Sequence, residues 1–143
     1  MSIEAFEKKS LTQATATALV EAGIAKASEL GVAATITVVD ETGTLKAVAR
    51  MDGAPIPTVA LGRAKAHTAA IWGAPTELWR TLGKDDVGLL VGFLGALDDV
   101  GIFAGGVPVT LDGAVVGGIS SSGGSEDQDM EIAQAALATV SGA

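Results

Sequence analysis

Residues 102–131 read IFAGGVPVTLDGAVVGGISSSGGSEDQDME, and this Gly-rich stretch decides the fold. Two runs rich in β-branched residues, 107–111 and 114–120, flank Asp112-Gly113, a preferred two-residue hairpin turn. Ser125 with Gln128 three residues later forms a capping box, which predicts the start of a helix. The stretch therefore predicts a hairpin followed by a helix, with an additional strand beginning at Ile102 and Phe103.

Earlier segments predict the partners of this unit. Strands are expected at 32–39 and 44–51, joined by a turn at 40–43. Helical spacing of apolar residues predicts a long first helix that Ser10 caps with Gln13 and that Gly31 ends. Further helices are expected at 58–71, with Thr58 as its cap, and at 85–97. The order of elements lacks strand–helix–strand alternation, so we expect an α+β domain with about five antiparallel strands covered by helices.

Composition narrows the class of protein. The 143 residues fit one domain, with residues 1–9 as an N-terminal extension. The net charge of −8 and the absence of a basic run argue against partners such as nucleic acid or anionic membrane. The lack of cysteine excludes disulfides and thiolate ligands. The polar N-terminus and the lack of an apolar run of about 20 residues predict a soluble, cytoplasmic protein. The nineteen glycines predict places where backbone approaches backbone or a ligand.

His67 is the single histidine of the sequence, on the Ala-rich face of the helix at 58–71. A lone helical histidine is compatible with simple packing or a surface position. It is also compatible with an axial iron ligand or an acid/base group, since histidine titrates near neutrality. A zinc site made of protein ligands alone would need three or four side chains, which the sequence does not group around His67.

Three further charged residues are candidates for a site. Arg50 and Lys65 could hold a carboxylate or propionate near the Gly-containing loop that carries Asp52. The same residues are also compatible with an internal ion pair between Asp52 and either cation. Asp129 follows Asp127 along a helix that presents acids to solvent, although Asp129 could turn inward.

The loop Ser122-Gly123-Gly124 precedes a helix N-terminus, where backbone amides can gather an anion. It lacks the Lys-Ser/Thr pair of a P-loop, and Glu126 and Asp127 already complement the helix dipole, which favours a loop that glycine shapes and Ser125 caps. Trp72 and Trp79 flank a helix break, and they are candidates for core or for an oligomer contact.

Several short motifs together resemble the GlcG/HbpS-like haem-binding family, whose domain also occurs at the C-terminus of PduO-type corrinoid adenosyltransferases. The motifs cover nearly the whole chain, in the family's order and spacing: Val38-Val39-Asp40, Arg50-Met51-Asp52-Gly53-Ala54, Lys65-Ala66, Thr68-Ala69, Gly105-Gly106-Val107-Pro108, Asp112-Gly113, Val116-Gly117, Ser122-Gly123-Gly124 and Asp127-Gln128-Asp129. The family usually has an aromatic residue, often Tyr, where this sequence has His67.

The resemblance implies a profilin-like domain that assembles into a homo-oligomer of four to eight copies and binds haem or a related small ligand. It also implies a possible link to haem degradation or redox sensing. In this interpretation His67 is the iron ligand, Arg50 and Lys65 meet propionates, and Thr68 and residues 122–124 line the site. An alternative is a cofactor-independent enzyme of small-molecule catabolism, with His67, Asp52 and Lys65 as catalytic groups and Arg50 or Lys65 holding a carboxylate or carbonyl substrate. A third is a structural subunit without a site.

Overall fold

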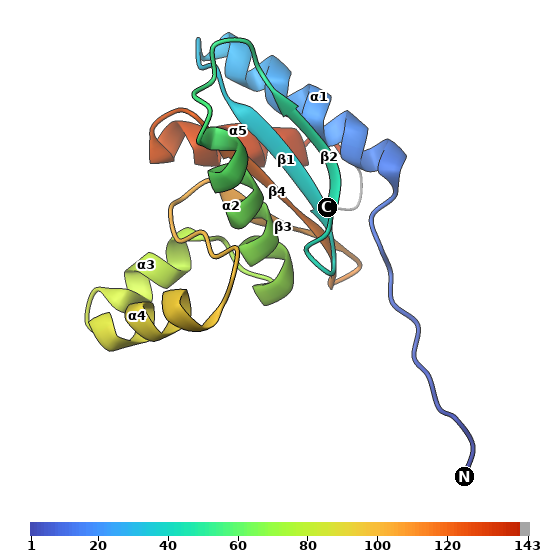
Figure 1. Cartoon of the computed structure of the whole chain (residues 1–143). Helices are drawn as coiled ribbons and strands as arrows, with labels where there is room; N and C mark the ends of the chain where they lie inside the picture. The colour runs from blue at the N-terminus through green and yellow to red at the C-terminus, as the bar shows by residue number, and fades with distance from the viewer. Residues whose placement is uncertain (141–143) are drawn as a thin grey trace.

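One antiparallel sheet forms the centre of the molecule (Figure 1). The computed structural model describes residues 1–140. Within them the strands lie in the order β2-β1-β4-β3. The elements in chain order are α1 (Gln13–Glu29), β1 (Thr35–Asp40), β2 (Leu45–Arg50), α2 (Thr58–Trp72), α3 (Glu77–Gly83), α4 (Val87–Ala96), β3 (Gly106–Leu111), β4 (Ala114–Ser122) and α5 (Glu126–Leu137).

The Gly-rich stretch 102–131 supplies half of this sheet and the first half of the covering helix α5. The turn residues Asp112 and Gly113 both have positive φ, +51° and +80°, as a type I′ turn requires. Ser125 caps α5 through the capping box with Gln128. The predicted hairpin and helix are therefore confirmed, and β4 pairs along its other edge with β1.

Helices cover both faces of the sheet (Figure 1). Side chains alternate along a strand, so Ile36 and Val38 of β1 join the core formed with α1 and α5. On the opposite face, Val39 packs with Ala66 and Ala70 of α2. The α+β architecture expected from the sequence is confirmed.

Helix α2 lies unusually close to the sheet because glycines face it. A Cβ on Gly118 would lie 2.4 Å from the Ala66 carbonyl oxygen, and one on Gly106 would lie 2.6 Å from that of Lys65. Either side chain would push the helix outward. These glycines therefore allow the backbone of α2 to approach β4 and β3 closely, as expected from the glycine content of the sequence.

Two local predictions were wrong. Ile102 and Phe103 are not in a strand, so the described sheet has four strands where about five were expected. The carbonyl of Phe103 instead accepts a hydrogen bond from the Thr76 hydroxyl, at 2.5 Å. Ser10 does not cap α1, because the Leu11 amide donates to Val116 of β4 and keeps this segment extended; Thr12 is the cap.

A smaller correction concerns α2. Thr58 was expected to cap this helix, but Pro57 is its N-cap and Thr58 is already its first residue. The Thr58 hydroxyl donates to the Pro55 carbonyl at 2.5 Å and lies 2.7 Å from the Thr35 hydroxyl of β1. It therefore ties the start of α2 to the sheet.

Helices α3 and α4 stand away from the sheet as a separate hairpin (Figure 1). Trp72 at the end of α2 meets Trp79 of α3 and Phe93 of α4, with ring centroids 4.6–5.4 Å apart. This aromatic cluster joins the hairpin to the body. At the other end of the chain, the exposed N-terminal segment that precedes Glu7 extends away as an arm (Figure 1).

Candidate functional site

His67 contacts the turn between β1 and β2. Its Nδ1 lies 3.1 Å from the carbonyl oxygen of Gly43, and the ring is half-buried. A carbonyl oxygen only accepts hydrogen bonds, so Nδ1 carries the proton of the neutral ring. The lone pair therefore remains on Nε2, the arrangement by which a backbone carbonyl orients a metal-binding histidine.

Gly43 makes room for the His67 ring. It has φ +78°, and a Cβ there would lie 2.3 Å from Nδ1, so another residue would displace the ring. The turn itself is shaped by Asp40, whose carboxylate accepts hydrogen bonds from the amides of Thr42 and Thr44 at 2.9 and 3.1 Å. Partial burial works in the other direction, but these hydrogen bonds keep the pKa of Asp40 below its ordinary value.

A groove of about 530 Å³ lies along the next turn of α2, and its lining residues do not include His67 or Gly43. Ala70 and Ile71, one helical turn after His67, form part of its wall, and Glu41 enters from the same turn as Gly43. The other lining residues are Glu7, Lys8, Lys9, Trp72, Gly73, Ala114 and Val115. The groove thus combines an apolar and aromatic wall with two lysines and two glutamates, a set suited to a flat ligand with polar groups at its edge.

Sequence reasoning missed the groove lysines. Lys8 and Lys9 lie in the N-terminal extension, which carries no motif, and only the path of the chain from the arm to α1 brings them beside Trp72. Lys9 also forms an ion pair of 2.9 Å with Asp112 in the β3–β4 turn. This contact fixes the base of the arm against the sheet.

Lys65 is placed away from the groove, in the interior. It is 3 % exposed, and its Nζ lies 3.2 Å from both the Asp129 carboxylate and the Ala104 carbonyl. Burial lowers the pKa of Lys65, while the negative charge of Asp129 opposes that effect. These internal contacts occupy the ammonium group of Lys65. Lys65 pairs with Asp129, so the ion pair between Lys65 and Asp52 that the sequence left open is wrong.

Thr68 and the Ser-Gly loop also make internal contacts. The Thr68 hydroxyl accepts a hydrogen bond from the Gly101 amide at 2.9 Å, which ties α2 to the chain before β3. Ser122 ends β4 opposite Thr35. The amide of Gly124 donates to the Asp129 carboxylate at 3.0 Å, so an internal carboxylate takes the place of an external anion there. Gly123 lies in the same turn, with φ +145°.

Arg50 and Asp52 lie at the far end of the β1–β2 hairpin. The Arg50 guanidinium donates to the Ala54 carbonyl at 2.9 Å. The six residues of β2 separate it from the turn that holds His67, a span of roughly 20 Å. The structure therefore does not bring His67, Arg50, Lys65 and Asp52 into one pocket within the described chain.

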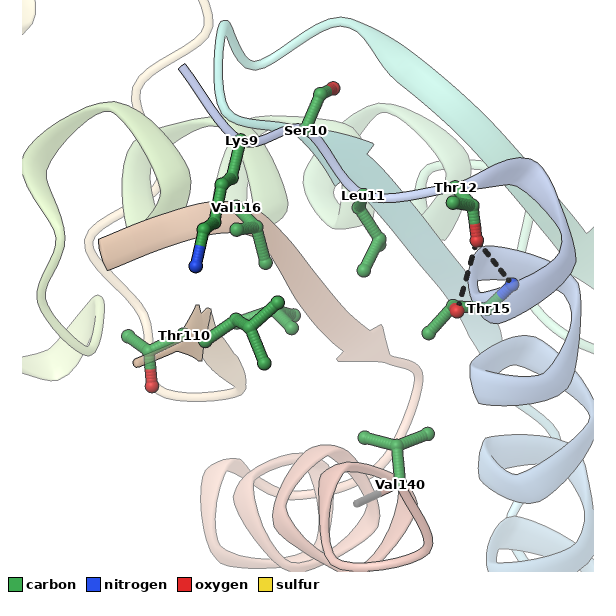
Figure 2. Close-up of a pocket in the computed structure, with 10 residues that line it drawn as sticks. Lys9, Ser10, Leu11, Thr12, Thr15, Thr110, Val116 and Val140 are labelled. Carbon is green, nitrogen blue, oxygen red and sulfur yellow. Dashed lines mark hydrogen bonds between the residues drawn. The ribbon is translucent and has the colours of Figure 1, made fainter. Parts of the chain in front are cut away.

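A second cavity lies on the other side of the sheet (Figure 2). It has a volume of about 320 Å³, with Leu11, Val116 and Val140 as apolar walls and the hydroxyls of Thr12, Thr15 and Thr110 near its rim. Thr12 and Thr15 are hydrogen-bonded to one another at 3.0 Å. Lys9, which is paired with Asp112, is the charged residue that lines this cavity, and His67 lies across the sheet from it.

Within residues 1–140, no group of three or more His, Asp or Glu side chains is placed so that it could hold a metal ion. No helix in the same range has both the length and the hydropathy needed to cross a bilayer.

The family model for "Haem degrading protein HbpS-like" matches residues 11–138, nearly the whole chain. The chain belongs to the HbpS-like family. Among curated HbpS-like relatives, a 15.0 kDa protein of the dhaT-dhaS intergenic region in Citrobacter freundii is 33 % identical, with 89 % of each chain covered. The corrinoid adenosyltransferase PduO of Salmonella typhimurium is 32 % identical over 85 % of this chain, which spans 36 % of that longer protein.

Solved structures of HbpS-like proteins share the fold. Protein ORFY of Klebsiella pneumoniae superposes with a TM-score of 0.89 at 29 % identity, covering 96 % of this chain and 95 % of ORFY. A complex of PduOC with haem superposes with a TM-score of 0.86 at 30 % identity, covering 92 % and 96 % of the two chains. The family expected from the sequence motifs is thus confirmed.

Proposed function

We propose that this chain binds haem, or a related tetrapyrrole, with His67 as the axial ligand. The observation that carries the proposal is the hydrogen bond from His67 Nδ1 to the Gly43 carbonyl, which leaves Nε2 free for iron. The haem complex of PduOC, a relative at 30 % identity, supports the choice of ligand. Bound haem would supply a redox-active iron centre.

The residues around His67 fit such a group. Ile71 and Trp72 are 43 % and 47 % exposed and offer apolar contact for a porphyrin face. Lys8 and Lys9 both line the same groove, but Lys9 is paired with Asp112, so Lys8 is the cation that a propionate would meet there. Lys8 takes the role that the sequence motifs suggested for Arg50 and Lys65, because those two side chains are committed to Ala54 and to Asp129.

The test is a titration with haemin, followed by the Soret band. We expect a shifted band that saturates at one haem per chain. His67→Ala should lose the shifted spectrum, and added imidazole should restore it by taking the vacated coordination position. Lys8→Glu with Lys9→Glu should weaken binding but keep the wild-type spectrum, since these residues do not touch the iron.

A matched control separates ligation from general damage. Thr81→Ala changes an exposed residue on α3 whose hydroxyl bonds only within its own helix, so it should bind haemin as the wild type does. An unshifted Soret band in the wild type would show that the chain does not bind haem as proposed. An unchanged spectrum in folded His67→Ala would remove the role of His67.

We also propose that the chain assembles into a homo-oligomer, as the resemblance implies. We therefore propose ligand binding and assembly for this chain.

The alternative function, a cofactor-independent enzyme, would need Asp52 within hydrogen-bond reach of a substrate that also meets His67. The length of β2 separates these two residues.

A further inference from the structure

Helix α4 is an apolar helix without a partner on its outer face. None of its ten residues, VGLLVGFLGA, is buried, and none is charged. Large exposed apolar surfaces on a protein mark sites of interaction. The net charge of the chain is −8, whereas α4 carries no charged side chain at all.

The outer face of α4 consists of a ridge beside a groove. Val87, Val91 and Leu94, at spacing i, i+4 and i+7, form the ridge and are 68 %, 65 % and 47 % exposed. The same spacing puts Gly88, Gly92 and Gly95 side by side, about 100° further round the helix. Leu90 lies on the inner face, against Gly83 of α3.

Gly92 and Gly95 have no packing role among the described residues of the chain. A Cβ on Gly92 or Gly95 would meet nothing within 4 Å, and neither residue has positive φ. Glycine inside a helix costs about 1 kcal/mol relative to alanine. The packing of this chain does not require that cost, but the close approach of another helix would.

We infer that α4 is the contact between two copies of this chain, with the ridge of each helix seated in the glycine groove of the other. A ridge beside a groove is complementary to itself under a two-fold axis, as an isologous dimer requires. An uncharged face also lets two copies that each carry −8 approach without placing like charges together. The inference rests on the proposed assembly, and it does not depend on haem binding.

The available area suits a dimer. Seven large apolar side chains of α3, α4 and the following residue are between 39 % and 68 % exposed: Leu78, Leu82, Val87, Leu89, Val91, Leu94 and Leu97. They offer on the order of 500 Å² of apolar surface before the glycines and backbone are added, against about 800 Å² per partner in a stable interface. The acids Asp85, Asp86, Asp98 and Asp99 lie just beyond the two ends of α4 and would form a polar rim.

Sedimentation velocity and light scattering test the interface. We expect the wild type to be an oligomer, and Val91→Lys and Gly92→Leu each to halve its mass or raise its dissociation constant at least about tenfold. Both positions are open in the single chain, so circular dichroism should show an unchanged fold. Ile56→Lys is the matched control: Ile56 is 79 % exposed, lies before α2, and should leave the mass unchanged.

Cross-linking gives an independent readout because the chain has no cysteine. Under oxidation Gly92→Cys should form a disulfide-linked dimer, whereas Ile56→Cys should remain a monomer on a non-reducing gel. A monomeric wild type at the highest concentration tested would overturn the assembly and the interface together. An oligomeric wild type whose mass survives Val91→Lys and Gly92→Leu would overturn the α4 interface alone.

Discussion

Lys65 and Asp129, 64 residues apart in the chain, form an ion pair of 3.2 Å with side chains only 4 % and 6 % exposed. The pair joins α2, on one face of the sheet, to α5, on the other. Asp129 also accepts hydrogen bonds from the Ser121 hydroxyl at 3.3 Å and from the Gly124 amide at 3.0 Å. The contact is therefore the point at which the Ser-Gly loop, α5 and α2 are fixed to one another.

Breaking this pair from one side should be costly. Lys65→Met leaves the Asp129 carboxylate buried without its cation, so we expect a loss of about 3–5 kcal/mol in the free energy of unfolding. Denaturant unfolding, with an unchanged m-value, measures the loss.

The double variant Lys65→Met with Asp129→Asn is the control for that loss. The Asn side chain still accepts the Gly124 amide but carries no charge, so the double variant should be more stable than Lys65→Met alone. Equal or lower stability of the double variant would show that the charge of Asp129 is not what makes the single change costly.

Gly105 should tolerate no side chain, because it lies directly beside the ion pair. It has φ +118°, and a Cβ would lie 2.7 Å from the Asp129 Cβ and 2.8 Å from Lys65 Nζ. We expect Gly105→Ala to cost several times the roughly 1 kcal/mol of backbone strain alone. Gly113→Ala isolates that strain, since Gly113 has φ +80° and nothing within 4 Å. Similar unfolding midpoints for the two variants would contradict the steric argument.

Interactions between residues that are close in the sequence could be predicted from the sequence alone. The Asp112-Gly113 turn and the Ser125–Gln128 capping box involve residues a few positions apart, and both exist. The Ser10 cap failed because a long-range bond from Leu11 to Val116 competes for the same segment. The capping propensity of a short segment gives no information about a long-range hydrogen bond of this kind.

The site was less readable than the fold. The sequence made Lys65 a candidate for binding an external anion. Its burial could not be predicted, because its partner Asp129 lies 64 residues later, on a helix that covers the other face of the sheet. Lys8 and Lys9 carried no signal, because the groove forms only when the extension passes Trp72. His67 was found by its chemistry, but the Gly43 contact that fixes its tautomer depends on how α2 crosses the hairpin.

The ion pair between Arg80 and Glu126 should make stability fall in acid. Arg80 of α3, together with the Ala104 amide, holds the pKa of Glu126 below its ordinary value. The unfolded state therefore takes up this proton more readily than the folded state. The contribution of Glu126 is complete above its ordinary pKa of about 4.5 and is lost as the pH falls through the lower, folded value.

Glu126→Gln tests this sign. The variant should be less stable than the wild type at pH 7, and the difference should shrink as the pH falls to about 3. Urea midpoints across that range measure the difference. Glu21→Gln changes an exposed carboxylate on α1, away from Arg80, and should run parallel to the wild type. A gap between Glu126→Gln and the wild type that stays constant with pH would contradict the role of Glu126.

Gly43 should control haem affinity through His67. A Cβ at this position would lie 2.3 Å from Nδ1, so Gly43→Ala should expel the ring from its contact with the carbonyl. The ring would then lose the partner that keeps the proton on Nδ1 and the lone pair on Nε2. We expect haemin affinity to fall by roughly 10–100-fold, the usual cost of removing a group that orients a metal ligand.

The control for Gly43→Ala is Gly31→Ala, at a glycine of similar φ, +69°, that ends α1 and has nothing within 4 Å. Both changes should lower stability by similar backbone strain, since both put Ala in the left-handed region. Gly43→Ala alone should also weaken haemin binding in a Soret titration. If both variants bind haemin as the wild type does, then the Gly43 carbonyl does not orient the ligand, and His67 either acts without it or does not bind the iron.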